Sequence, residues 1–263
     1  METLSEASAQ AYRERLFILP TGLSMFRKLA LALAVTAAFS AAPLSAQQLD
    51  YANQQRWQSV HDQSQSPIDI QTRQAQPADT EEDNTLVFRN TEAAGLKVVD
   101  NGHAVEIEVK GPDALIRGRH FDLVQIHFHA ASEHTIDGEH FPLEGHYVFR
   151  AKDGRLAVVG VMYREGAPNP MAGEVLEELA EADEGEIEHE DIAEMLPAVK
   201  SYHHYLGSLT TPPLTENVEW YVLDQPVTLS AAQIRGFEQR YSRNNRMIQP
   251  LNGRPLIHAA AQH

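Results

Sequence analysis

The chain has 263 residues, of which 43% are hydrophobic and 22% charged, and its formal net charge is −16. This length and composition indicate a single globular domain with a substantial core, while the negative charge argues against nucleic acids and anionic membrane surfaces as partners. The sequence has no cysteine, which excludes disulfides, thiolate metal ligands and cysteine nucleophiles.

The first informative stretch of the chain covers residues 25–46. A basic pair at Arg27 and Lys28 precedes an apolar run, and small residues follow it up to Ala46. This order is typical of a secretory signal peptide, and the apolar run is shorter than the roughly 20 residues of a membrane span. We therefore expect a periplasmic or secreted protein that keeps no membrane attachment after signal cleavage.

Residues 1–24 precede this signal and carry Glu2, Glu6 and Glu14, which are unusual in front of an exported chain. We interpret residues 1–24 as a non-native N-terminal extension, with translation starting at Met25. A long, atypical signal is the alternative. Either interpretation leaves residues 47–263 as the mature domain.

The mature chain contains several short runs of β-branched or aromatic residues, separated by Gly, Asp, Asn and Pro. Such runs predict strands, and they cover residues 85–89, 96–99, 105–109, 156–163 and 220–223. One helix is expected over residues 231–242, with Ser230 as its N-cap. The pattern predicts a β-rich domain with minor helices.

Residues 125–148 hold the most concentrated set of metal-ligating side chains. Side chains alternate between the two faces of a strand, so Gln125, His127 and His129 share one face. The same rule places Glu144, His146 and Val148 on one face of a second strand. Asp137-Gly138 is a turn signal between the two runs, and an antiparallel return would bring the three imidazoles together.

Three neutral imidazoles with a fourth, open position form the ligand set of a catalytic tetrahedral zinc. Gln125 and Glu144 each lie two residues before a histidine and on its face, where a hydrogen-bond partner would orient the ring. A lone strand histidine is ordinarily structural or exposed. The third histidine and the two partners favour the metal site.

Acidic residues are concentrated over residues 174–194, where 11 of 21 positions are Asp or Glu. Val175, Leu176 and Leu179 fit a short amphipathic helix, and Pro197 marks a later stop. A solvated face is the simple interpretation of the charge. Adaptation to high ionic strength, which screens repulsion between carboxylates, is the sharper hypothesis.

Several motifs together resemble the α-class carbonic anhydrases over nearly the whole chain after residue 50. They are QSPIDI (65–70), NGH (101–103), QIHFHAASEHT (125–135), EGHYV (144–148), GSLTTPP (207–213) and QPLNGR (249–254). The resemblance implies a mainly β (α+β) fold, with a large central twisted, mostly antiparallel sheet and short peripheral helices. It also implies that residues 47–263 are a zinc-dependent catalytic domain for the reversible hydration of carbon dioxide to bicarbonate and a proton.

The resemblance further implies a role for individual residues. Zn²⁺ would bind His127, His129 and His146, with the backbone near Asn244 accepting a hydrogen bond from His129. Thr210, oriented by Glu133, would accept a hydrogen bond from a zinc-bound hydroxide, and His103 would be the proton shuttle. Thr211 would help to bind bicarbonate, and the carbon dioxide pocket would be lined by Val148, Val158, Leu209, Val218 and Trp220.

Other interpretations stay open at this point. Residues 210–213 would also fit a rigid surface turn, because they end in two prolines. His127, His129 and Glu133 also resemble half of the cupin metal motif, with Glu133 as a ligand of iron or manganese. A catalytically inactive relative with a binding role is the third alternative. Weak esterase activity and a homodimer are both compatible with the sequence.

Overall fold

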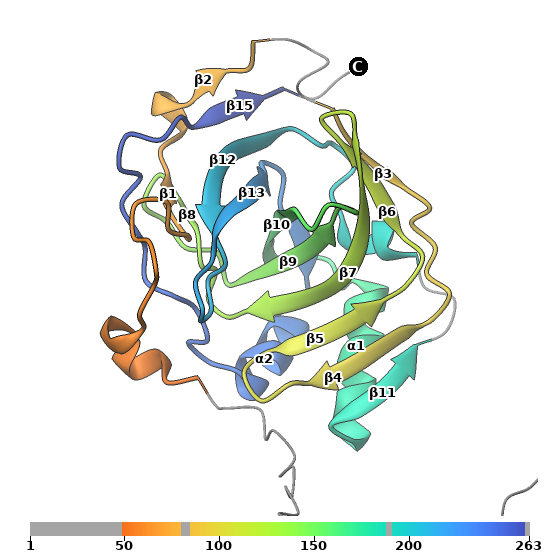
Figure 1. Cartoon of the computed structure of the whole chain (residues 1–263). Coiled ribbons are helices and arrows are strands. Elements are labelled where there is room, and N and C mark those ends of the chain that lie inside the picture. Colours follow the sequence, from red (N-terminus) through yellow and green to blue (C-terminus); the bar gives the residue numbers. More distant parts are fainter. Residues whose placement is uncertain (1–48, 80–84, 188–190, 261–263) are drawn as a thin grey trace, which may run out of the picture. The chain divides into compact units, whose positions relative to one another are not determined.

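The computed structural model describes residues 49–79, 85–187 and 191–260 (Figure 1). The predicted extension at 1–24 and the predicted signal peptide at 25–46 lie outside these described residues. Within the described ranges, the longest apolar helical stretches fall short of what a membrane span requires.

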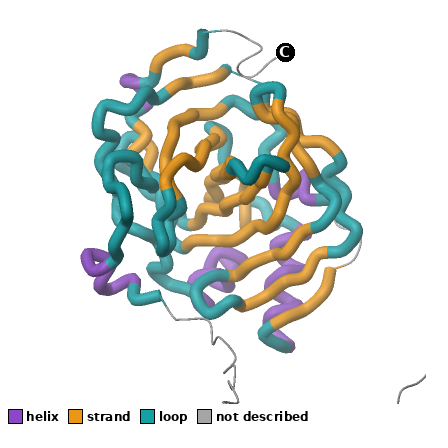
Figure 2. Tube along the Cα trace, viewed as in Figure 1, coloured by secondary structure: helices purple, strands orange, loops and turns teal. Residues whose placement is uncertain are grey.

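Strands dominate the described part of the chain (Figure 2). They are β1 (Asp69–Ile70), β2 (Gln76–Pro77), β3 (Leu86–Arg89), β4 (Leu96–Asp100), β5 (Val105–Val109), β6 (Asp113–Ile116), β7 (Arg119–His129), β8 (Thr135–Ile136), β9 (Leu143–Arg150), β10 (Leu156–Glu165), β11 (Glu184–Ile187), β12 (Tyr202–Ser208), β13 (Glu216–Leu223), β14 (Val227–Leu229) and β15 (Ile257–Ala259).

One large sheet contains all of these strands except β1 and β8, which form a separate parallel pair. Its main path runs β11-β4-β5-β7-β9-β10-β13-β12-β15-β2, with β14, β3 and β6 attached at the sides. Most neighbours are antiparallel, and the parallel pairs are β10 with β13, β10 with β14 and β15 with β2. The mainly β fold with a large twisted sheet is thus confirmed (Figure 1).

All five predicted strand runs are present, with small differences at their ends. The largest difference is in β13, which begins at Glu216 rather than at the expected Trp220. The first half of β13 is polar and only partly buried or exposed at Glu216, Asn217 and Glu219. A prediction based on apolar runs therefore missed the start of the strand. The pairing of β13 with β12 nevertheless extends to Glu216.

Two α-helices and three short 3-10 helices complete the described elements. They are α1 (Pro170–Glu181), α2 (Ala231–Arg240), η1 (Tyr51–Arg56), η2 (Thr72–Gln74) and η4 (Ile192–Met195). Ser230 caps α2 as predicted, and Gln233 completes the capping box. The helix predicted around Val175 is also present. It ends at Glu181, well before Pro197, because the chain then turns into β11 and pairs with β4.

The alternation of side chains divides the apolar residues into two clusters. Phe128 and Phe149, from β7 and β9, pack with Val175 of α1 and Phe237 of α2 in the larger cluster. The smaller cluster contains Trp220 and lies among β10, β12 and β13. Because strand neighbours point to opposite faces, the histidines of β7 point away from the helices that cover Phe128.

Candidate metal centre

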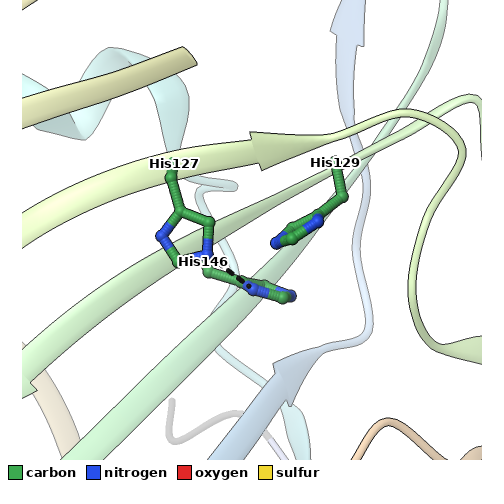
Figure 3. Close-up of side chains that lie close together, drawn as sticks. All are labelled: His127, His129 and His146. Carbon is green, nitrogen blue, oxygen red and sulfur yellow. Dashed lines mark hydrogen bonds between the residues drawn. The ribbon is translucent and has the colours of Figure 1, made fainter. Parts of the chain in front are cut away.

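Three histidines from two adjacent strands converge at the centre of the sheet (Figure 3). The antiparallel register of β7 and β9 pairs His127 directly with His146, and His129 with Glu144. One ring nitrogen from each of His127, His129 and His146 lies within 4.8 Å of the other two. The ring centroids are 4.5 to 5.0 Å apart. The backbone pairing alone therefore brings the three imidazoles to one point.

In each imidazole, the nitrogen that points away from the centre of the cluster lies against a hydrogen-bond acceptor. His127 Nδ1 lies 2.7 Å from Gln125 Oε1, and His129 Nδ1 lies 2.7 Å from the backbone oxygen of Asn244. His146 Nε2 lies 3.0 Å from Glu144 Oε1. A backbone carbonyl or a carboxylate only accepts, so the ring nitrogen facing it carries the proton. Gln125, Asn244 and Glu144 thus each accept a hydrogen bond from one of the three imidazoles.

The fixed tautomers leave His127 Nε2, His129 Nε2 and His146 Nδ1 facing one another. His146 Nδ1 is 3.3 Å from His127 Nε2. Among the described residues, no group donates a hydrogen bond to the buried His129 Nε2. Three converging lone pairs repel one another, and a divalent cation would satisfy all three. The donor set therefore fits a zinc ion with three nitrogen ligands.

The electrostatic setting favours neutral imidazoles on β7. Burial, followed by repulsion from His129 and His146, lowers the pKa of His127 well below its usual range. Burial likewise lowers the pKa of His129. Burial would also lower the pKa of His146, but the neighbouring Glu144 carboxylate outweighs it and raises that pKa. Neutral imidazole is the form that binds a metal.

Residues 130–142 form an excursion between β7 and β9. Hydrogen bonds to Glu144 hold this excursion next to the three histidines. Glu144 Oε2 accepts hydrogen bonds of 2.8 Å from the backbone N–H groups of Glu133 and His134. Its Oε1 accepts another at 2.8 Å from His134 Nδ1. Asp137 and Gly138 do form a turn with positive φ, as predicted. This turn closes the tip of the excursion, where Ile136 pairs with Glu139, and does not join β7 directly to β9.

His134 is a supporting residue to which the sequence assigned no functional role. Its Nε2 lies 2.7 Å from the Tyr205 hydroxyl, which donates a 2.8 Å hydrogen bond to Ser66 Oγ. Ser66 belongs to the QSPIDI motif, so the network ties that motif to Glu144. Gly207 lets β12 approach Ser66, because a Cβ at this position would collide with Ser66 Oγ. Only its adjacency to Glu133 pointed to His134 in the sequence.

Glu133 lies beside the histidines and is fully buried. Its Oε1 accepts a 2.7 Å hydrogen bond from the backbone N–H of Arg246 and is 3.6 Å from His129 Nδ1. Its Oε2 is 3.9 Å from His146 Nδ1 and, within the described part of the chain, has no hydrogen-bond partner. Thr210 is buried and Thr211 half-buried. The implied hydrogen bond from Thr210 to Glu133 is therefore not formed in this arrangement.

His103 lies in the turn between β4 and β5 and is partly buried, and burial lowers its pKa. Its backbone N–H donates to Asn101 Oδ1 at 3.1 Å. Asn101 Nδ2 donates to Glu106 Oε2 at 2.8 Å, and Gln125 Nε2 approaches the same oxygen at 3.4 Å. One carboxylate thus links the shuttle candidate to the residue that orients His127.

Glu106 is a second residue that the sequence reasoning missed. Its Cα pairs with that of His127 in the β5–β7 register, so its side chain lies on the histidine face. In the sequence it is one of two glutamates in the alternating run Val-Glu-Ile-Glu-Val, with nothing to separate it from an exposed strand residue. Only the register between β5 and β7 distinguishes it from Glu108.

The residues expected to line the carbon dioxide pocket gather beside the three histidines. Val158, Val218 and Trp220 are buried in the smaller apolar cluster, and Val148 and Leu209 pack against it partly buried. The ring centroid of Trp220 is 4.9 Å from that of His146. An apolar wall therefore adjoins one metal-ligand candidate, which suits a small, uncharged molecule.

The family model of eukaryotic-type carbonic anhydrase matches residues 52–260. A carbonic anhydrase of Pectobacterium atrosepticum is 42% identical over 201 residues, which cover 74% of this chain and 80% of that protein. The family match contains every residue discussed for the metal centre.

Solved structures are similar over the same part of the chain. A hyperthermostable carbonic anhydrase from an active hydrothermal vent chimney is 37% identical, with a TM-score of 0.68 over 75% of this chain and 88% of that chain. The α-carbonic anhydrase of Thermovibrio ammonificans, solved with the inhibitor sulfanilamide, is 34% identical. Its TM-score is 0.64 over 74% of this chain and 87% of that chain.

Proposed function

Because the chain belongs to the eukaryotic-type carbonic anhydrase family, whose reaction is the hydration of carbon dioxide, we propose that this reaction takes place at the three-histidine site. The observation that carries the proposal is the convergence of His127 Nε2, His129 Nε2 and His146 Nδ1, with each opposite nitrogen held by an acceptor. Rings fixed in this way require no rearrangement to accept a metal.

Zinc is the ion that this donor set fits best. Three neutral nitrogens with no carboxylate in the set suit zinc better than calcium or magnesium, which prefer oxygen ligands. When bound, zinc would lower the pKa of a coordinated water into the neutral range, a general property for which carbonic anhydrase is the standard example. The protein residues then have to orient the attacking oxygen and remove the proton.

Glu133 and Thr210 are proposed to orient the attacking oxygen. Glu133 is anchored through Oε1 by the backbone N–H of Arg246. No described residue donates to its Oε2, which is available to accept a hydrogen bond from the Thr210 hydroxyl. A threonine that donates to Glu133 must accept through its remaining lone pairs, so it selects an oxygen that still carries a proton. This would aim the opposite lone pair at the carbon of the substrate.

Val148, Val158, Leu209, Val218 and Trp220 are proposed to hold carbon dioxide against the attacking oxygen, because this molecule is small, linear and weakly hydrogen-bonding. Thr211 would help to bind the bicarbonate product. Weak esterase activity would follow from attack of the same oxygen on other carbonyl carbons.

His103 is proposed as the proton shuttle. The net reaction of carbon dioxide with water yields bicarbonate and one proton, which must leave the site in every turnover. A partly exposed imidazole can take this proton through ordered water and pass it to buffer. Asn101 fixes the turn that carries His103 through its backbone N–H.

The alternatives retain little support. A cupin-type site would use Glu133 as a ligand, but the family membership and the hydrogen bond from Arg246 argue for an orienting role. A metal-free binding relative would not need three oriented imidazoles. Export to the periplasm or the medium remains our proposal from the signal-like residues 25–46, and N-terminal sequencing of the exported protein would test it.

Stopped-flow carbon dioxide hydration with zinc analysis tests the proposal. We expect one zinc at the three-histidine centre and rapid hydration from the wild type, and loss of this zinc and of hydration in His146→Ala. His103→Ala should keep its zinc and lose rate in weak buffer, with recovery when a small imidazole buffer is added. A wild-type protein that binds zinc but does not hydrate carbon dioxide would overturn the catalytic assignment and favour a binding role.

A further inference from the structure

A second cluster of two histidines and one aspartate lies at another place on the sheet. His203 on β12 pairs directly across the strands with His258 on β15. Asp224 follows the end of β13, and its backbone N–H donates a 3.0 Å hydrogen bond to Ser201. Three neighbouring strands therefore fix the positions of the three side chains. The sequence assigned no function to either histidine.

The distances between ring nitrogens and carboxylate oxygens in this cluster are as short as the hydrogen bonds that hold the rings of the three-histidine centre. His203 Nδ1 lies 2.8 Å from Asp224 Oδ1, and His258 Nε2 lies 2.8 Å from Asp224 Oδ2. One potential ligand atom from each residue lies within 4.8 Å of the other two. The side chain of His203 is 8% exposed, that of Asp224 19% and that of His258 40%. The cluster is thus accessible to ions from solvent while largely ordered by its surroundings.

The contacts differ from a simple hydrogen-bonded triad in one respect. Asp224 Oδ1 is buried and, among the described residues, no donor points at it with hydrogen-bond geometry, although His203 Nδ1 is only 2.8 Å away. A buried carboxylate oxygen without a donor is costly. A cation bridging His203 Nδ1 and Asp224 Oδ1 would satisfy both atoms, once they separate to the roughly 3.3 Å between neighbouring ligands of tetrahedral zinc.

We propose that His203, Asp224 and His258 form a second divalent-metal site, distinct from the three-histidine centre. Two imidazole nitrogens and one carboxylate oxygen suit zinc, nickel or copper, whereas calcium and magnesium require more oxygen ligands. All three residues line a cavity of about 310 Å³, which leaves room for water molecules to complete the coordination. The site therefore has both the donors and the space that a metal ion needs.

Charge and topology indicate what such an ion would do. The chain carries a net charge of −16, which raises the local concentration of divalent cations. β15 pairs with β12 over only three residues, and β2 is attached to the sheet through β15. An ion held by β12, β15 and the end of β13 would fasten this edge of the sheet. Binding to the folded state alone would then raise the melting temperature.

Zinc titration of the purified, zinc-loaded protein tests this proposal. We expect equilibrium dialysis with elemental analysis to find a second equivalent of zinc, and the melting temperature to rise by several degrees as it binds. His258→Ala and Asp224→Asn should each lose the second equivalent and the thermal shift while they keep the first zinc and normal carbon dioxide hydration. His61→Ala, at an exposed position outside both clusters, is the matched control and should keep both.

His146→Ala separates this proposal from the proposed catalytic function, because it should lose the first zinc and retain the second. Retained hydration by His258→Ala and Asp224→Asn shows that these variants have folded. A stoichiometry that stays at one, or a second equivalent that survives in both variants, would overturn the second site. A thermal shift of equal size with magnesium would also overturn it, since this donor set does not suit that ion.

Discussion

The two histidine clusters of this protein use the same side chains in opposite ways. At the three-histidine centre Gln125, Asn244 and Glu144 each hold one ring through the nitrogen that points away from the other two rings. Among the described residues, no group donates to His129 Nε2 at the centre of the cluster. In the His203–Asp224–His258 cluster the carboxylate contacts both rings, with one oxygen at a nitrogen of each. The acidic group thus supports the ligands in the first cluster and is itself a ligand candidate in the second.

This difference bears on what each cluster can do with a metal. A set of neutral ligands leaves the full charge of the ion to act on a bound water, whereas a carboxylate ligand offsets part of it. The first cluster also lies against an apolar wall that contains Trp220, while the second is nearer to solvent. The arrangement of the first suits catalysis, and that of the second suits fastening an edge of the sheet.

Replacing His146 by alanine should have the largest effect and would test whether the first cluster depends on all three ligands. Removing even an outer partner of a zinc ligand typically costs about 10–100-fold, so loss of a ligand should reduce activity by more than about 100-fold. Zinc bound at the first cluster and the hydration rate should fall together. His140→Ala, on the excursion but outside the cluster, is the control. If the zinc stoichiometry of His146→Ala is the same as that of the wild type, the first site does not consist of these three residues.

Glu144→Gln would convert the supporting carboxylate into a neutral group of the same shape. Glu144 is fully buried and accepts hydrogen bonds from His146, from His134 and from two backbone N–H groups. We expect zinc affinity to fall roughly 10–100-fold and the free energy of unfolding to fall by about 3 kcal/mol. Chelator competition and urea denaturation measure the two effects. Glu139→Gln, at an exposed turn, should change neither.

The sequence predicted the site best where the alternation of side chains along a strand determines which residues share a face. Alternation placed His127 and His129 on one face and Gln125 behind them, and the β7–β9 register has them there. It could not supply contacts between strands far apart in the chain. Glu106 meets Gln125 through β5, and His258 meets His203 through β15, and neither pairing leaves a local pattern in the sequence.

The hydrogen bonds of loop residues were equally inaccessible without a resemblance. His129 is held by a backbone oxygen 115 positions later in the chain, and no spacing rule predicts such a partner. The long excursion from residue 130 to 142 shows the limit of turn signals as well. Asp137-Gly138 was identified correctly as a turn, but the strands it joins are not the ones that carry the ligands.

Glu106→Gln would test whether residues that do not contact the three histidines directly also contribute to metal binding. Its carboxylate accepts from Asn101 and is approached by Gln125 at the longer distance of 3.4 Å, so its influence on His127 is indirect. A glutamine at this position would replace the accepting carboxylate by a third amide, next to the donating amides of Asn101 and Gln125. We expect about a fivefold loss of zinc affinity, or about 1 kcal/mol, the net contribution of one ordinary hydrogen bond.

The same variant should also slow proton transfer, because Asn101 fixes the turn that carries His103. The diagnostic readout is the dependence of kcat on buffer concentration, which a purely structural effect would leave unchanged. Glu108→Gln, at the more exposed neighbouring position on β5, is the control. Equal behaviour of the two variants would remove Glu106 from the list of positioning residues.

The smallest predicted effect concerns the second cluster without metal. Burial raises the pKa of Asp224, but contacts with His203, Ser201 and His258 outweigh it and lower the pKa to about 2. Because this value is below the ordinary 3.8, the contacts stabilise the folded protein above about pH 4, and this stabilisation is lost as the pH falls towards 2. Partial exposure limits the contribution to the order of 1 kcal/mol.

Asp224→Asn lacks this contribution, so in the presence of a chelator the difference in unfolding free energy between wild type and variant should be largest near pH 6 and should shrink towards pH 2. Urea denaturation at several pH values measures it. Asp62→Asn, on an exposed loop, is the control. A difference that does not depend on pH would mean that Asp224 acts on stability through packing alone. Only metal binding would then distinguish Asp224, as a ligand candidate, from the supporting Glu144.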